Sequence, residues 1–124
     1  MWTLKCYIAG QDSGFRGWYD SQDPEIPAQI DVTLENLTAL RDWDRTPLYD
    51  ELRGRFEGLG EIRVDTDTAS YRLLGFMSGR REFTILCGFW KLSNADYASE
   101  CPKARNRKEG ALKDDRRVSI WSVP

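Results

Sequence analysis

The stretch from residue 71 to residue 91 constrains the fold of this chain more than any other part of its sequence. Two runs rich in apolar and aromatic side chains flank a polar tip at 78–81, a pattern that predicts a β-hairpin. Four cations lie inside the first run, at the tip and at the end of the second run: Arg72, Arg80, Arg81 and Lys91. Packing alone does not require cations at these places. We therefore expect the hairpin to present them to an anion, most simply RNA phosphate.

Periodicity along the rest of the chain predicts the order β-α-α-β-β-β-α-β. The expected elements are a strand at 2–8, an irregular insertion at 10–27, helices at 28–43 and 46–58, a strand at 62–65, the hairpin, a polar link at 94–100, a basic helix at 102–115 and an extra strand at 118–124. The fold class that follows is α+β. Two N-terminal helices are expected to pack on one face of a twisted, mostly antiparallel sheet, with a basic helix near the C-terminus.

The two N-terminal helices rest on different signals. Ile30, Leu34 and Leu37 recur at the spacing of one helix face, which supports the helix at 28–43. The helix at 46–58 is predicted from Thr46 and Pro47, a capping residue followed by a proline at the first helical position. Both helices carry mostly acidic charges, so we expect them to be structural.

Length and composition indicate a single globular domain over residues 1–124. The chain is 40% hydrophobic and 31% charged, which is the ordinary balance of such a domain. No apolar run reaches the roughly 18 residues of a membrane helix, and the N-terminus has no signal-peptide layout. We expect a cytoplasmic protein without a membrane partner.

Cysteine and histidine usage bears on the chemistry. Cys6, Cys87 and Cys101 are odd in number and far apart, and two of them lie in apolar runs, which predicts buried free thiols. The chain has no histidine, so it lacks both the usual zinc ligand and the usual acid–base residue for neutral pH. We expect neither a metal nor another cofactor.

The charge is distributed unevenly along the chain. The net charge is −2, but residues 1–62 hold 6 Lys/Arg against 12 Asp/Glu, whereas residues 63–124 hold 12 against 8. Local charge sets the field at a binding surface. The second half is therefore the better candidate for an RNA surface, although a solvated surface of mixed charge would have the same composition.

Several short motifs follow one another at a familiar spacing: Arg55-Phe56, Glu61-Ile62-Arg63, Tyr71-Arg72 and Gly88-Phe89-Trp90-Lys91, with a basic segment after them. In this order they resemble the RelE/ParE superfamily of toxins, in particular its HigB-like, phage-derived branch. The resemblance covers roughly residues 48–112, about half of the chain. It agrees with the element order predicted from periodicity.

The resemblance implies a RelE-like fold and the activity of a messenger RNA endoribonuclease, commonly acting on the ribosome and without a metal. The implied partners are a cognate antitoxin, messenger RNA and the ribosome. Matched position by position, Arg72 corresponds to the family's strand arginine, Arg63 to a cation on the preceding strand and Lys91 to the lysine at the end of the following strand.

RNA cleavage of this kind requires the 2′-hydroxyl to lose a proton, the phosphorane charge to be stabilised and the 5′-oxygen to gain a proton. Arginine suits the second task because its guanidinium binds two phosphate oxygens, so Arg72 is the candidate, assisted by Arg80 or Arg81. Lys91 is a candidate for proton transfer if clustered cations keep it neutral. Tyr97 is the candidate proton donor. The alternative for Arg72 is a structural ion pair with a nearby carboxylate such as Glu57 or Glu61.

We expect a second group of residues to bind the RNA backbone and bases: Arg80, Arg81, Trp90, Lys103, Arg105, Arg107 and Lys108. The basic helix could instead be masked by an antitoxin or be an ordinary solvated face. At the level of function, the alternative is a catalytically inactive, phage-type module on the same fold that acts by protein–protein contact. An action on gyrase, as in the ParE branch, is a minor third option.

Overall fold

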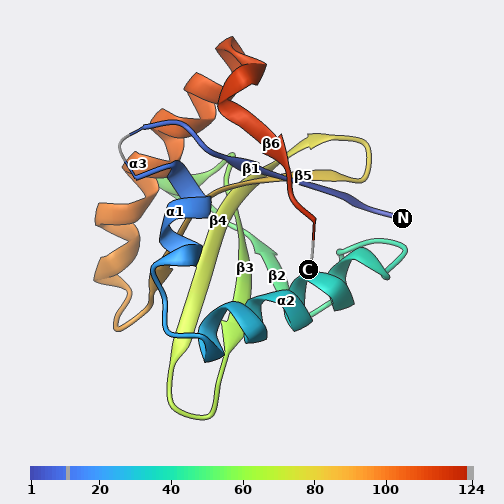
Figure 1. The fold of residues 1–124 in the computed structure, drawn as a ribbon, viewed down its shortest axis with the longest axis vertical. Helices are drawn as coiled ribbons and strands as arrows, with labels where there is room; N and C mark the ends of the chain where they lie inside the picture. Colours follow the sequence, from blue (N-terminus) through green and yellow to red (C-terminus); the bar gives the residue numbers. More distant parts are fainter. Residues whose placement is uncertain (11, 123–124) are drawn as a thin grey trace.

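The computed structural model describes residues 1–10 and 12–122. Its three helices and six strands give the α+β class predicted from sequence (Figure 1). In chain order the elements are β1 (Thr3–Tyr7), α1 (Gly14–Asp20), α2 (Glu25–Thr38), β2 (Tyr49–Glu51), β3 (Gly60–Asp65), β4 (Ser70–Gly79), β5 (Glu82–Trp90), α3 (Ala95–Lys113) and β6 (Val118–Ile120). Two short 3-10 helices, at Gly54–Phe56 and Asp115–Arg117, lie between them.

The strands form one mixed sheet in the order β2-β3-β4-β5-β1-β6. The predicted hairpin is β4–β5 and lies at the centre of the sheet. Strand β1 runs parallel to β5, and every other pair of neighbours is antiparallel, so the expectation of a mostly antiparallel sheet is confirmed. A register shift between Leu74 and Gly75 marks a bulge in the hairpin, after which β4 continues to its tip.

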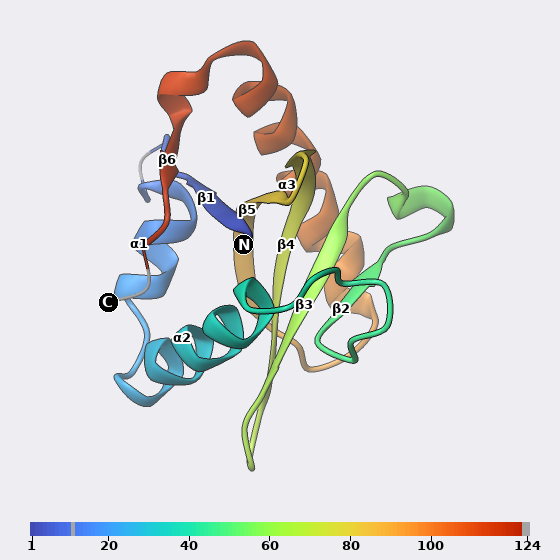
Figure 2. The same cartoon turned by 90° about the vertical axis from the view of Figure 1, so that its right-hand side faces the viewer.

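Helices cover both faces of the sheet, whereas the sequence predicted a pair of helices on one face. Helices α1 and α2 lie on one side and α3 lies on the other (Figure 2). Alternating strand residues divide the core accordingly. Ile62, Leu73 and Phe83 pack toward α1 and α2, whereas Leu74 and Phe89 pack toward α3. The sheet is thus the middle of three layers.

The predicted helix at 46–58 is wrong. The segment instead forms the edge strand β2 and a 3-10 turn, with Gly54 at a φ of +64°. Thr46 does accept a hydrogen bond from the Leu48 N–H, but it does so in a turn. The ring of Tyr49 lies 5.7 Å from that of Phe83, so pairing with β3 and packing on the sheet override the local helix signal.

The prediction that residues 10–27 form an irregular insertion is also wrong, because α1 and the first turn of α2 lie within this segment. Residue 11 is outside the described part of the chain. Phe15, Trp18 and Tyr19 have the i, i+3, i+4 spacing of a helix face, a signal hidden by the surrounding glycines and polar residues. The next helix starts and ends earlier than the predicted 28–43. It accommodates Pro27 in its first turn, where no backbone donor is needed.

Helix α3 begins before the predicted 102–115, so the polar link at 94–100 is wrong as well. The Asp96 carboxylate accepts hydrogen bonds from the N–H groups of Leu92 and Ser93, which stabilises the turn entering the helix. The helix then continues through Pro102. The last strand is confirmed as β6 and is shorter than predicted; residues 123–124 lie outside the described residues.

Two composition-based expectations can be compared with the fold. Cys6, Cys87 and Cys101 are all buried and free, as predicted. No helix in residues 1–10 and 12–122 has the length and apolar character needed to cross a membrane.

Candidate functional site

A polar cluster lies on the face of the sheet that α3 covers. Arg63 of β3 is the register partner of Arg72 of β4, and Asp65 is the register partner of Ser70. The backbone N–H of Lys91 donates to the carbonyl of Ser70 at 2.8 Å, so β5 continues this row. Because side chains alternate along a strand, these residues share the face opposite α1 and α2. The sheet register therefore brings together three cations separated by as many as 28 positions in the sequence.

Helix α3 adds a tyrosine to this face. The ring of Tyr97 packs edge-on against Phe89, with the centroids 5.7 Å apart, and its hydroxyl donates to Glu61 Oε2 at 2.5 Å. Lys91 Nζ lies 5.6 Å from the centre of the same ring. We call the group formed by Glu61, Arg63, Asp65, Arg72, Lys91 and Tyr97 the sheet-face cluster. It contains all four residues predicted as catalytic.

The two arginines of the cluster differ in their access to solvent. Arg72 is only 8% exposed, and its Nη1 bonds Asp65 Oδ1 at 3.0 Å, while its Nε lies 3.8 Å from Glu61 Oε2. The Arg63 side chain is 36% exposed and contacts Glu61 at 3.3 Å and Asp50 at 3.2 Å. Arg72 therefore lies beneath the surface beside the buried Glu61, as the structural alternative expected, and it bonds the exposed Asp65 from below. Arg63 instead reaches the surface.

The cluster favours defined protonation states. Burial and the hydrogen bond to Glu61 raise the pKa of Tyr97 to about 12, although Arg72 opposes the shift. Burial opposes the charged form of Arg72, but hydrogen bonds to Asp65 and Tyr97 outweigh it and raise its pKa. Burial likewise opposes the charge on Asp65, yet hydrogen bonds from Arg72 and Ser70 lower its pKa. At neutral pH the phenol is therefore protonated and the Arg72–Asp65 pair is ionised.

We expect Tyr97 to ionise near pH 12, well above the ordinary value of 10. Because the folded state favours the protonated phenol, its contribution to stability is complete below pH 10 and is lost as the pH rises through about 12. The measurement is the difference between the tyrosinate absorbance titrations of the wild type and the Tyr97→Phe variant. A transition near pH 10 in this difference would show instead that the phenol is not held by Glu61.

Two members of the cluster were not predicted as site residues. Glu61 was considered only as an ion-pair partner of Arg72, and Asp65 was not considered. Their alternation with Ile62 and Val64 was visible in the sequence and places all charges of β3 on one face. What the sequence could not show is which face α3 would cover.

The structure does not bring the hairpin tip or Trp90 to the cluster. Arg80 and the adjacent Arg81 follow the end of β4, and eight residues at about 3.3 Å each place Arg80 about 26 Å from Arg72. Trp90 is 54% exposed, but it precedes Lys91 and so faces the opposite side of the sheet. Any role of these three residues in binding RNA would need a second contact surface.

The basic residues of α3 are also used within the fold. Lys103 pairs with Glu100, Arg105 donates to the carbonyls of Arg55 and Glu57, Arg107 donates to the carbonyl of Leu86, and Lys108 donates to the carbonyl of Gly58. At 1.5 Å per residue they lie about 9–16 Å beyond Tyr97 along the helix axis. Arg105 and Lys108 thus fasten the loop before β3 to α3.

The fold and the cluster define a small α+β protein with an ionised, tyrosine-containing site on one sheet face. The sequence profile of the family described as Phage derived protein Gp49-like (DUF891) matches residues 17–109, which include every member of the cluster. The chain belongs to this Gp49-like phage-derived family, a RelE/ParE-like toxin family. The comparison with curated proteins gave no match. The resemblance to RelE/ParE toxins is confirmed at this level, and the HigB-like branch remains a prediction.

Proposed function

We propose that this protein is the toxin of a type II toxin–antitoxin pair, in the HigB-like branch, and that it cleaves messenger RNA on the ribosome. The observation that supports the proposal is the convergence of Arg63, Arg72, Lys91 and Tyr97 from three strands and a helix onto one sheet face. A cognate antitoxin is the expected protein partner. Membership of a toxin family gives the proposal its context.

The cations of the cluster have separate roles in this proposal. Arg63 and Lys91 are both partly exposed, and they bind the scissile phosphate and stabilise the phosphorane charge. Arg72 is buried, so it is a positioning residue that fixes Asp65 and Glu61. This division moves the phosphate-binding role from Arg72, the residue favoured by sequence, to the cations that RNA can reach.

Proton transfer is assigned to the two remaining groups at the surface. Asp65 has a side chain that is 58% exposed, and its carboxylate takes the proton of the 2′-hydroxyl as that oxygen attacks phosphorus. The bond from phosphorus to the 5′-oxygen breaks, and Tyr97 gives its proton to the departing oxygen. A phenol with a pKa of about 12 is still a stronger acid than an alkyl hydroxyl. The products are a 2′,3′-cyclic phosphate and a 5′-hydroxyl.

A second candidate function is that of a catalytically inactive binding module of phage type. The observation that favours it is charge balance at the cluster. Asp50, Glu61 and Asp65 each contact an arginine of the cluster, so three carboxylates face the three cations, Lys91 included. A phosphate must compete with Asp50 and Glu61 for Arg63.

The two functions are separated by inducing the wild type and the Lys91→Gln variant in a bacterial host. We expect the wild type to arrest growth and fragment messenger RNA, and the variant to do neither, because it loses a partly exposed cation at the reacting phosphate. Lys113→Gln is the matched control, since it removes an exposed lysine from the last turn of α3 and should remain toxic.

Other outcomes would contradict the nuclease assignment. Healthy growth and intact RNA with soluble wild-type protein would leave the binding module. Growth arrest with intact RNA would indicate another target, such as gyrase. If Lys91→Gln is as toxic as the wild type, the sheet-face cluster is not the site of the reaction.

A further inference from the structure

Strand β4 has an open edge beyond the point where β3 begins. β3 starts at Gly60, opposite Gly75, whereas β4 runs on toward the hairpin tip. The Thr66 N–H donates to the Ala69 carbonyl, and hydrogen-bonded pairs alternate from there along the antiparallel ladder. The N–H and C=O of Met77 therefore point to the side where β3 is missing. Within the described residues, no group from outside the ladder bonds to them.

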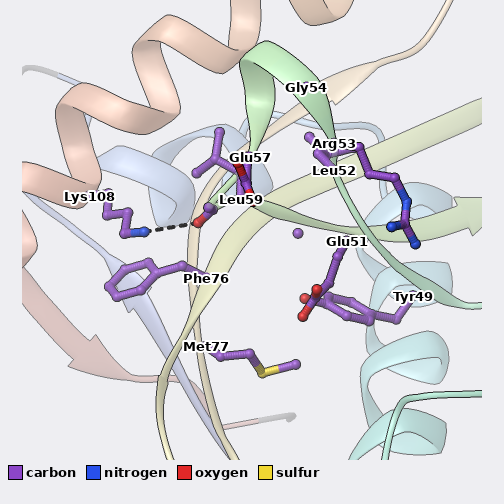
Figure 3. A pocket seen from close by; sticks show the side chains of 12 residues that line it. Tyr49, Glu51, Leu52, Arg53, Gly54, Glu57, Leu59, Phe76, Met77 and Lys108 are labelled. Atoms are coloured by element: carbon purple, nitrogen blue, oxygen red, sulfur yellow. Dashed lines mark hydrogen bonds between the residues drawn. The ribbon is translucent and has the colours of Figure 1, made fainter.

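A cavity of about 380 Å³ lies beside this edge on the side of α3. Figure 3 shows Phe76 and Met77 of β4 across the hollow from Tyr49 and Glu51 of β2. Leucine side chains and Phe76 supply apolar surface, and Lys108 closes one side by donating to the Gly58 carbonyl. The cavity is therefore suited to an apolar side chain with a polar rim around it.

A second cavity, of about 320 Å³, shares Met77, Tyr49 and Glu51 with the first and extends toward α2. Two of its walls are Trp2 and Trp43, whose rings stack with centroids 4.2 Å apart. Four acidic residues also line it, Asp42, Asp44, Asp50 and Glu51, although the Asp50 carboxylate bonds Arg63 on the other face of the sheet. The two cavities thus lie on either side of one stretch of open strand edge.

The second cavity is complementary to a cation. Its lining contains four acidic residues against a single basic one, Arg53. Asp50 is engaged by Arg63, but Asp42, Asp44 and Glu51 form no ion pair among the described residues. Part of the acidic excess of residues 1–62 thus gathers beside stacked indoles, away from the sheet-face cluster. The partly exposed indole of Trp2 and the carboxylates together favour a guanidinium, whereas the carboxylates repel a phosphate backbone.

We propose that the open edge of β4 at Met77 accepts an extended segment of a partner protein that carries an arginine. The segment adds a strand beside β4, using the free N–H and C=O of Met77. Successive side chains of a strand point to opposite faces. The arginine therefore enters the cavity lined by Trp2 and Trp43, and a neighbouring apolar residue enters the cavity lined by Phe76.

This surface is separate from the sheet-face cluster. Met77 lies five residues from Arg72, which is about 16 Å along β4. The proposal therefore does not depend on nuclease activity, and a partner bound here would leave the cluster uncovered unless it extends along the sheet.

The test uses the full chain and a fluorescently labelled, capped hexapeptide of alternating arginine and valine. We expect saturable binding by fluorescence anisotropy, with a shift of the Met77 amide resonance in the NMR spectrum. Two matched peptides, one with glutamate in place of arginine and one N-methylated at alternate residues, should bind at least about 10-fold more weakly, as loss of the charge or of one or two hydrogen bonds implies.

Protein variants complete the test. Asp44→Asn and Glu51→Gln should each lower the affinity for the arginine peptide by roughly 2–5-fold, which is the effect of losing one exposed charge pair. Asp20→Asn, which removes an exposed carboxylate at the end of α1, should leave affinity unchanged. Equal binding of the N-methylated peptide would overturn strand addition. Displacement of the peptide by a uridine oligonucleotide, with the same Met77 shift, would show that the surface binds nucleic acid and would also overturn the proposal.

Discussion

Replacing Arg72 with alanine is expected to lower the free energy of unfolding by about 3 kcal/mol, the lower end of the range for breaking a buried ion pair. The variant leaves Glu61, whose side chain is 5% exposed, without its neighbouring guanidinium, and it also unpairs Asp65. The effect is not larger because Tyr97 and Arg63 still bond to Glu61. Urea denaturation of the wild type and the variant at neutral pH measures the difference.

The pH dependence of this difference has a definite sign. Because the folded state lowers the pKa of Asp65, the stability that this carboxylate contributes is present above its ordinary pKa of 3.8 and is lost as the pH falls through the lowered value. The gap between the wild type and Arg72→Ala should therefore narrow in acid.

Arg63→Ala is the matched control for Arg72→Ala. Its side chain is 36% exposed, so its removal should change the free energy of unfolding by only about 0–1 kcal/mol. Combining Glu61→Gln with Arg72→Met should restore most of the loss, because the buried charge is then gone. If Arg63→Ala and Arg72→Ala lower the free energy of unfolding by equally small amounts, Arg72 is not a positioning residue. Direct contact of Arg72 with phosphate would then be the better interpretation.

Replacing Tyr97 with phenylalanine is expected to slow RNA cleavage by about 10²–10⁴-fold, the usual contribution of a positioned proton donor. In the proposed mechanism the phenol of Tyr97 is the proton donor, and with a pKa of about 12 it is protonated at neutral pH. The ring contacts with Phe89 and Phe56 remain in the variant, so the fold should be retained. Single-turnover cleavage of messenger RNA by purified protein, with ribosomes supplied, measures the rate.

A modified substrate distinguishes the loss of proton donation from a change in the folding or the geometry of the site. When sulfur replaces the bridging 5′-oxygen, the leaving group needs no proton. We therefore expect the Tyr97→Phe variant to cleave this substrate at nearly the wild-type rate. If it is equally slow on both substrates, Tyr97 acts through position or folding. If the rate on normal RNA is unchanged, the donor is another group.

The central hairpin could be predicted because its signals are local. Period-2 alternation, a short polar tip and β-branched or aromatic residues lie in one continuous stretch, and the structure has β4 and β5 there. Helix α3 was predicted only in part because Pro102 was read as its start. The turn at Ser93 and Asp96 carries the earlier capping signal. The helix predicted at 46–58 failed because a strand partner far along the chain decided its structure.

The residues of the candidate site could be predicted from the sequence better than the role of each residue could. Arg63, Arg72, Lys91 and Tyr97 were chosen from sequence, and the fold does gather them. The sequence offered an ion pair of Arg72 with Glu61 only as an alternative and could not show that Arg72 would be buried. Burial depends on what packs over a residue, and here that is α3, which begins more than twenty positions later in the chain.

By itself the sequence determined the α+β class, the central hairpin, the buried free thiols and the charge asymmetry between the two halves, because each depends on composition or on spacing within a short segment. Only the tertiary structure decided which strands pair, that helices cover both faces, and which cations remain exposed. Those properties depend on contacts between residues far apart in the chain. The same reason explains the open edge at Met77, which exists because β3 starts opposite Gly75 and not at the hairpin tip.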